Sequence, residues 1–183
     1  MHKKCPENTR NCQIWHIAEQ NGVMCHMKKI MFVCHGNICR SPMAEFIFRD
    51  IVKKRGAEKE FVIASSATST EEIWGDRGNP VYPPARDELK AHGICCHGKT
   101  AVQLTKADYA KYDLLIGMDS ANIRNMNRIC GGDPDGKIKK LMDYTTRPGD
   151  VADPWYSDRF DIAYRDIEEG CLALFAAITG EKR

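Results

Sequence analysis

The sequence lacks the features that mark several large classes of protein. No apolar run approaches the roughly 20 residues that a membrane-spanning helix requires. The formal net charge is only +2, from 27 basic and 25 acidic residues, so nothing argues for binding to nucleic acid or to a membrane surface. There is no internal repeat and no low-complexity tract. With 43% hydrophobic and 28% charged residues in a chain of 183, we expect one globular domain.

The nine cysteines also lack the spacing of a disulfide framework. Their odd number and scattered positions predict free thiols and hence a reducing compartment, the cytoplasm. The first 26 residues contain three cysteines and three histidines, but their spacing matches no standard zinc finger. We therefore expect no metal site there, at His2, Cys5, Cys12, His16, Cys25 and His26.

Residues 1–26 differ from the rest of the chain. Charged and amide side chains interrupt any apolar periodicity, and there is no hydrophobic segment of the kind found in secretory signal peptides. From Met27 a basic pair leads into a run of apolar residues that resembles the first strand of a domain. We expect residues 1–26 to be a flexible N-terminal extension and residues 27–183 to form the domain.

From Met27 onward, short apolar segments alternate with amphipathic ones. The expected strands are residues 29–33, 61–64, 113–118 and 138–142, and the expected helices are residues 42–54, 85–91, 119–129 and 160–178. Such alternation implies parallel strands joined by right-handed crossovers. The sequence thus predicts a three-layer α/β fold, a four-stranded parallel sheet with helices on both faces. In such sheets the ligand site lies beyond the carboxyl ends of the strands.

The most informative stretch is residues 34–42, Cys-His-Gly-Asn-Ile-Cys-Arg-Ser-Pro, between the first expected strand and the first expected helix. Cys34 and Arg40 lie six positions apart across a Gly-Asn bend. This arrangement suits a covalent phosphatase, in which a thiolate attacks phosphorus, backbone N–H groups surround the phosphate oxygens and the guanidinium holds two of them. The stretch lacks the Gly-Lys-Ser/Thr ending of a nucleotide-binding Walker loop.

The residue types in this stretch suit an anion-binding loop. An ordinary thiol has a pKa of about 8.5, and a helix N-terminus with a nearby cation can lower it to roughly 3.5–7.5, so Cys34 can ionise. Gly36 and Asn37 tolerate the left-handed conformations that turn successive N–H groups inward. We expect Ser41 to be the helix N-cap, in an extended conformation, and Pro42 to be the first helical residue.

The stretch resembles the signature of the low-molecular-weight protein tyrosine phosphatases. The resemblance runs from about Met27 to the C-terminus and is also carried by residues 65–70, 86–94, 118–122 and 153–156, which fall in the order and spacing of that family. It implies a four-stranded parallel sheet, Cys34 as the nucleophile, Arg40 as the phosphate clamp and Asp153 as the general acid. No metal or other cofactor is implied.

The resemblance also implies supporting roles in the phosphate-binding loop. Asn37 would brace the loop, Ser41 would steady the thiolate, and Ser65 would hold Asn37. The expected phosphate-binding loop contains residues that offer backbone N–H groups and residues whose side chains support it. They are His35, Gly36, Asn37, Ile38, Cys39 and Ser41.

The segment that begins at Asp153 would supply a proton to the leaving oxygen. On spacing alone, Asp150 and Asp158 compete with Asp153 for this role. Trp155 and Tyr156 can form the wall of a slot for an aromatic leaving group.

The family often carries an aromatic specificity residue where this chain has Glu71. Trp74 is the candidate that would take the place of this aromatic residue in the wall.

Cys39 places a second thiol five residues from Cys34. Many family members share this pair, so we expect Cys39 to be a redox partner that forms a disulfide with oxidised Cys34 and protects it from further oxidation.

Several activities occur on this fold and loop. Ile38 favours phosphotyrosine in a protein as the substrate, because the related protein-arginine phosphatases carry Thr at that position. Arsenate reductases need two further thiols downstream, and no cysteine occurs between Cys96 and Cys130. A protein that binds phosphate, or that senses oxidants through Cys34 and Cys39, without turnover is the non-enzymatic alternative.

Overall fold

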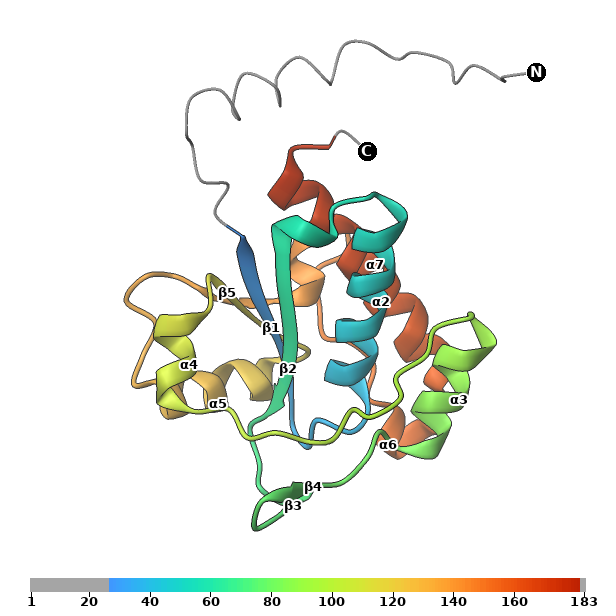
Figure 1. Ribbon diagram of the computed structural model, residues 1–183. Coiled ribbons are helices and arrows are strands. Elements are labelled where there is room, and N and C mark those ends of the chain that lie inside the picture. The colour runs from blue at the N-terminus through green and yellow to red at the C-terminus, as the bar shows by residue number, and fades with distance from the viewer. Residues whose placement is uncertain (1–26, 182–183) are drawn as a thin grey trace, which may run out of the picture.

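Four parallel strands form the central sheet of the computed structural model, which describes residues 27–181 (Figure 1). The strands are β1 (Lys28–Cys34), β2 (Phe61–Ala67), β5 (Leu114–Gly117) and β6 (Ile138–Lys140), in the spatial order β2-β1-β5-β6. The predicted α/β fold with a four-stranded parallel sheet is confirmed.

Helices cover both faces of this sheet (Figure 1). They are α2 (Arg40–Lys54), α3 (Pro83–Ala91), α4 (Lys106–Lys111), α5 (Ser120–Cys130), α6 (Pro154–Ser157) and α7 (Phe160–Thr179), with short 3-10 helices at η1 (Glu58–Glu60) and η2 (Leu141–Tyr144). Alternate residues of β1 enter opposite layers of the core, as the period of a strand requires. Ile30 and Phe32 pack with the α2 and α7 side, whereas Met31 and Val33 pack with the α4 and α5 side.

Four short elements were not predicted from the sequence. The strands β3 (Ile73–Trp74) and β4 (Arg77–Gly78) form a two-residue antiparallel hairpin, and α4 and α6 span six and four residues. Segments of this length contain too few residues to show a hydrophobic period. The fourth strand also ends earlier than predicted, because Leu141 and Met142 turn inward in η2 and join the core.

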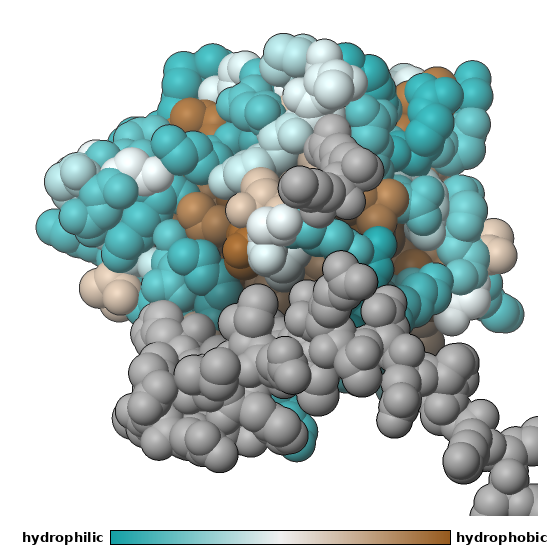
Figure 2. Space-filling view, turned by 90° about the horizontal axis from the view of Figure 1, so that it is seen from above, coloured by the Kyte–Doolittle hydropathy of each residue, from teal (hydrophilic) through white to brown (hydrophobic). Residues whose placement is uncertain are grey.

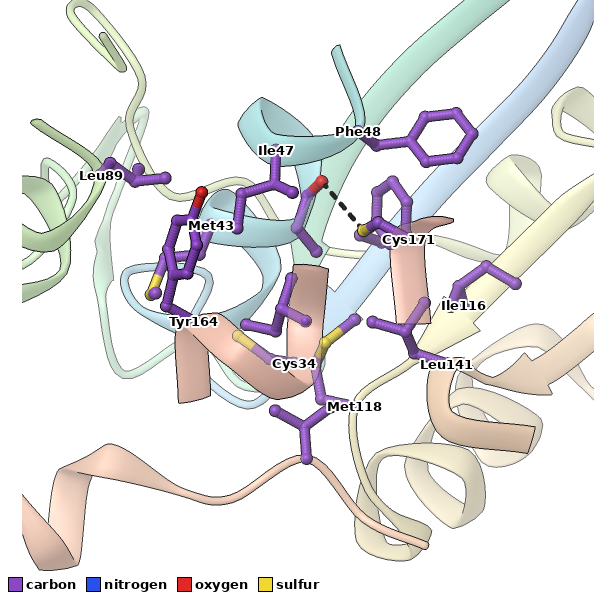
Figure 3. Packing of buried hydrophobic residues seen from close by; sticks show 14 of the residues in the cluster. Cys34, Met43, Ile47, Phe48, Leu89, Ile116, Met118, Leu141, Tyr164 and Cys171 are labelled. Carbon is purple, nitrogen blue, oxygen red and sulfur yellow. Dashed lines mark hydrogen bonds between the residues drawn. The ribbon is translucent and has the colours of Figure 1, made fainter. Parts of the chain in front are cut away.

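The helices α2 and α7 pack against each other over the centre of the sheet. Figure 3 shows Met43 and Ile47 of α2 with Tyr164 and Cys171 of α7, and Cys34 belongs to the same cluster. The Cys171 thiol donates to the backbone carbonyl of Ala44 in α2 at an Sγ–O distance of 3.8 Å. The end of β1 and the start of α2 are thus fixed by the largest part of the core.

The far end of the molecule, where the described chain begins and ends, has a different character. Figure 2 looks onto this end and shows a mostly hydrophilic surface in which the hydrophobic areas are small and separate. Among residues 27–181, no helix combines the length and the apolar character needed to cross a lipid bilayer.

A close helix contact in the core yields a stability prediction. A Cβ at Gly170 of α7 would lie 2.5 Å from Cγ of Leu141, which is fully buried. We expect Gly170→Ala to lower the free energy of unfolding by about 1–3 kcal/mol, as overpacked cores do. The measurement is urea unfolding followed by circular dichroism.

Gly149→Ala is the matched control, because a Cβ there would have no atom within 4 Å. Its effect should stay within about 0.5 kcal/mol. An equal effect of the two substitutions would contradict this account of the α7 contact.

Candidate active site

The loop between β1 and α2 lies at the carboxyl edge of the sheet, as expected for a ligand site in this architecture. Cys34 is the last residue of β1, and the N-terminus of α2 follows at Arg40. Asn37 adopts a left-handed conformation, with φ of 56°. Gly36 does not use the left-handed conformation that it tolerates. A Cβ there would lie 3.0 Å from Cγ of Glu72, so the Glu72 side chain would have to shift to admit one.

The helix begins earlier than predicted, which corrects the capping role of Ser41. Cys39 precedes the helix and gives no side-chain cap, while Ser41 and Pro42 are its second and third residues. Pro42 costs no hydrogen bond there, because the first-turn N–H groups of a helix have no intrahelical partner. Ser41 is therefore helical rather than extended, and its hydroxyl faces the inside of the loop.

A chain of buried hydrogen bonds leads from the Cys34 sulfur to the neighbouring strand. Ser41 Oγ lies 3.0 Å from Cys34 Sγ and accepts from Asn37 Nδ2 at 2.9 Å. Asn37 Nδ2 also donates to Ser65 Oγ at 2.8 Å, while its Oδ1 accepts from the backbone N–H of Val102 at 3.0 Å. The side chain of Asn37 thus links the loop to α2, to β2 and to the backbone at Val102, which is the arrangement expected for a residue that braces the loop.

The chain of hydrogen bonds continues to three charged residues that the sequence analysis missed. Ser65 Oγ donates to Oε2 of Glu45, a residue of α2 that is only 4% exposed, at 2.6 Å. Lys99 lies 3.3 Å from the same carboxylate, and Arg49 donates to Oε1 at 2.7 Å. The detectable signal was an acidic residue within the apolar face of the helix, four positions before Arg49.

Arg40 is buried, and its charge is matched by two carboxylates from distant parts of the chain. Nη1 donates to Asp119 Oδ2 and Nη2 to Asp153 Oδ2, each at 2.7 Å, and Nη1 also lies 3.5 Å from the carbonyl oxygen of Val151. Burial opposes the charge, but Cys34, Asp153 and Asp119 outweigh it and raise the pKa of Arg40. The role of Asp119 in the site was not predicted. Asp119 also caps α5 by accepting the N–H of Asn122.

These residues open onto a single pocket of about 420 Å³. Its walls combine the loop, both carboxylates that hold Arg40 and the aromatic residues after Asp153. They are Cys34, His35, Gly36, Ile38, Cys39, Arg40, Glu71, Glu72, Asp119, Ala121, Asn122, Asn125, Asp153, Trp155 and Tyr156. Asn37, Ser41 and Ser65 lie behind this surface and support it.

Trp74 does not lie in the pocket wall. It is in the β3–β4 hairpin and is 71% exposed, whereas Glu71 and Glu72 occupy the wall on that side. The carboxylate oxygen Oε2 of Glu71 lies 2.9 Å from Nε2 of His35 and accepts a hydrogen bond from it. The side chain that replaces the expected aromatic residue is thus an acid tied to the loop.

The two competing acids lie outside the pocket wall. Asp150 Oδ1 accepts from the N–H and hydroxyl of Ser120 and from Lys140 Nζ. Although burial opposes ionisation, these hydrogen bonds lower the pKa of Asp150, which disfavours the protonated form that an acid catalyst needs. Asp158 follows α6 at its far end, in a left-handed conformation. Asp153 is the one of the three that contacts Arg40.

All six cysteines among residues 27–181 are free thiols. Cys39 is buried and shares the pocket wall with Cys34. Burial, followed by the negative charge of Cys34, raises the pKa of Cys39 to about 12. Within the same residues no group of three His, Cys, Asp or Glu side chains is placed to hold a metal ion, and the six Cys and His positions before Met27 lie outside the described residues.

Comparison with known proteins decides the family. The model of the family described as low molecular weight phosphotyrosine protein phosphatase matches residues 29–183. The chain belongs to this phosphatase family. Its relatives include low molecular weight protein-tyrosine-phosphatase YfkJ of Bacillus subtilis, 37% identical over 86% of this chain and 99% of that protein. The low molecular weight phosphotyrosine protein phosphatase of Rattus norvegicus is 35% identical over 80% of this chain and 92% of the rat protein.

Solved structures of this phosphatase family have the same fold. The crystal structure of YfkJ superposes with a TM-score of 0.75, at 37% identity over 86% of this chain and 98% of that one. The Drosophila arginine phosphatase DARP also superposes with a TM-score of 0.75, at 25% identity over 84% of this chain and 99% of that one. The proteins with a similar structure thus include one named as a tyrosine phosphatase and one named as an arginine phosphatase.

Proposed function

We propose that the chain is a cysteine-dependent phosphatase that hydrolyses phosphotyrosine in proteins through a thiophosphate intermediate on Cys34. The observation that carries the proposal is the convergence of Cys34, Arg40 and Asp153 on one pocket at the N-terminus of α2. A helix N-terminus and inward-turned N–H groups favour a bound phosphate dianion.

In the first step, the Cys34 thiolate attacks phosphorus and the bond to the tyrosyl oxygen breaks. Ser41 Oγ, 3.0 Å from the sulfur, stabilises the thiolate by donating its hydrogen bond. The contacts of Arg40 with Asp119, Asp153 and Val151 engage three of the five N–H groups of its guanidinium, which leaves two to hold phosphate oxygens. Asp153 gives its proton to the leaving oxygen, so tyrosine departs neutral.

In the second step, the Asp153 carboxylate takes a proton from a water molecule, and the oxygen of this water attacks the phosphorus. The bond from sulfur to phosphorus breaks, inorganic phosphate leaves, and the Cys34 thiolate and protonated Asp153 are restored. The same carboxyl group therefore serves as acid and then as base. The hydrogen bond of 2.7 Å between Asp153 and Arg40 supports this double role, because it would hold the carboxyl group beside the phosphate in both steps.

The walls of the pocket support phosphotyrosine as the substrate. Ile38 contributes an apolar side chain, and Trp155 and Tyr156 stand next to Asp153 on the side where the leaving group departs. Aromatic and aliphatic walls suit a phenyl ring. Phosphoarginine is the second candidate, supported by the similarity to the Drosophila arginine phosphatase, and a side-by-side assay of the two phosphoamino acids decides between them.

Three further features belong to the proposal. Residues 27–183 form the phosphatase domain, in line with a family match that begins at residue 29.

Six free thiols among the described residues support a reducing compartment, the cytoplasm. Cys39 is the redox partner of Cys34: peroxide oxidises the Cys34 thiolate to a sulfenic acid, and the Cys39 sulfur then displaces water to form a disulfide.

The first prediction concerns the nucleophile and the clamp. Cys34→Ser should abolish turnover of p-nitrophenyl phosphate while leaving inorganic phosphate binding largely intact. Arg40→Lys should lose most of the activity, because a point charge cannot replace the planar fork or satisfy both carboxylates. EDTA should have no effect on the wild-type rate. Full activity in Cys34→Ser, or a metal requirement, would contradict the mechanism.

The second prediction concerns the acid. Asp153→Asn should lower kcat/KM by about 10²–10⁴ for aryl phosphates with basic leaving groups. The loss should shrink for good leaving groups, which need less proton donation. Asp158→Asn is the control, since Asp158 does not line the pocket. An equal deficit across the leaving-group series would remove Asp153 from this role.

The third prediction concerns oxidation. Mild peroxide should inactivate the enzyme, and dithiothreitol should restore it. Cys39→Ser should make the loss largely irreversible, because the sulfenic acid at Cys34 then has no thiol beside it. Cys95→Ser, at an exposed cysteine, should recover like the wild type. Unchanged recovery in Cys39→Ser would exclude the protective disulfide.

The fourth prediction concerns the start of the domain. A chain that begins at Met27 should fold and keep wild-type kcat/KM, because the sheet, the loop and the pocket all lie within the residues after it. Thermal unfolding and the p-nitrophenyl phosphate assay measure this. A large drop in the melting temperature would show that the first 26 residues contribute to stability.

A further inference from the structure

The segment that carries Asp153 has little regular structure of its own. It joins η2, which ends at Tyr144, to the four-residue helix α6, which begins at Pro154. Its position must therefore come from contacts with the rest of the fold. One such contact is the hydrogen bond from the backbone N–H of Val151 to the carbonyl oxygen of Met118, at 2.9 Å.

A buried carboxylate on α7 provides a second anchor that the catalytic steps do not use. Asp166 is 5% exposed. Its Oδ2 accepts from the backbone N–H of Ala152 at 3.3 Å, and its Oδ1 accepts from Arg147 Nη2 at 2.7 Å. The same side chain thus holds the segment at two points, one of them the residue directly before Asp153. Burying a carboxylate is costly unless it is paired and hydrogen-bonded, and these two contacts meet that condition.

Arg147 is itself held by a second acid. Its Nε donates to Glu169 Oε2 at 2.8 Å. Glu169 shares the contact with Arg147 but is more exposed than Asp166, and among the described contacts it has no hydrogen bond to the backbone of residues 145–153. The pair offers a way to separate the anchoring of the segment from the general stability of α7.

We infer that Asp166, with Arg147, is a positioning residue that fixes Ala152 and thereby orients the Asp153 carboxyl group toward the leaving oxygen. The helix α7 packs against α2, which begins with Arg40, so Asp166 ties the acid to the same rigid unit that carries the phosphate clamp. This inference rests on the proposed role of Asp153 as general acid.

The test replaces Asp166 by Asn. An amide offers one acceptor oxygen where the carboxylate has two, so its NH₂ group must face either Arg147 or the N–H of Ala152, donor against donor. We expect kcat/KM to fall about 10–100-fold for aryl phosphates with basic leaving groups, as a small displacement of a catalytic group does. For good leaving groups the loss should be much smaller, and inhibition by inorganic phosphate should stay unchanged.

Two comparisons make the result specific. Glu169→Gln, the matched control, should leave the leaving-group dependence of kcat/KM as in the wild type. In an Asp153→Asn background, Asp166→Asn should cause little further loss, because residues that act through one another are not additive. A loss that is equal for all leaving groups, or that is fully additive with Asp153→Asn, would overturn the inference and leave Asp166 a stability residue.

Two outcomes need separate handling. If Asp166→Asn does not fold, Arg147→Gln tests the same anchor at a half-exposed side chain. Arg147→Lys should then restore part of the activity. Wild-type leaving-group dependence in Arg147→Gln would overturn the inference. If Asp153→Asn alone shows no leaving-group dependence, the proposed acid is wrong and the inference falls with it. A leaving-group effect in Asp153→Asn but not in Asp166→Asn overturns the inference alone.

Discussion

A buried guanidinium whose charge must be matched organises the catalytic end of this molecule. Arg40 is 4% exposed, and its two terminal nitrogens bind Asp119 and Asp153. Those carboxylates stand at the N-termini of α5 and α6, so one charge draws the starts of three helices to one place. Removing either acid would leave an N–H group of the buried guanidinium without its partner, while the other acid still balances the charge.

On the other side of Cys34, the proposed nucleophile, the constraint is a chain of hydrogen bonds. It runs from Cys34 through Ser41, Asn37 and Ser65 to the buried carboxylate of Glu45. Each member uses its donors and acceptors on the next, so the left-handed turn at Asn37 is held without help from a ligand. In the proposed reaction, a loop that already has this shape would need no reorganisation when the phosphate binds.

The sequence was sufficient for the parts that rest on local pattern. The alternation of apolar strands and amphipathic helices predicted the parallel sheet, and the nine residues from Cys34 placed the loop at its carboxyl edge. The predictions that failed concern residues whose partners are distant in the sequence, or elements too short to show a pattern. Ser41 left the cap position because its hydroxyl bonds to Cys34 and Asn37, and Trp74 stayed outside the pocket because its hairpin turns it to solvent. Asp119 and Glu45 were missed because each carboxylate gains its role by pairing with a cation, and only the folded chain shows which cation lies beside it.

The separation of Arg40 from its partners along the chain has a consequence for how the enzyme is made. Its two ion pairs close loops of 79 and 113 residues, among the longest-range contacts of the fold. Closing such loops costs conformational entropy, and the ion pairs stabilise the chain only when both ends are in place. A refolding chain should regain helical signal early, while catalytic competence appears only with the last cooperative assembly of the sheet edge. Activity is thus a reporter of complete folding, and a nascent chain still lacking its last thirty or so residues would have the nucleophile but not yet the site.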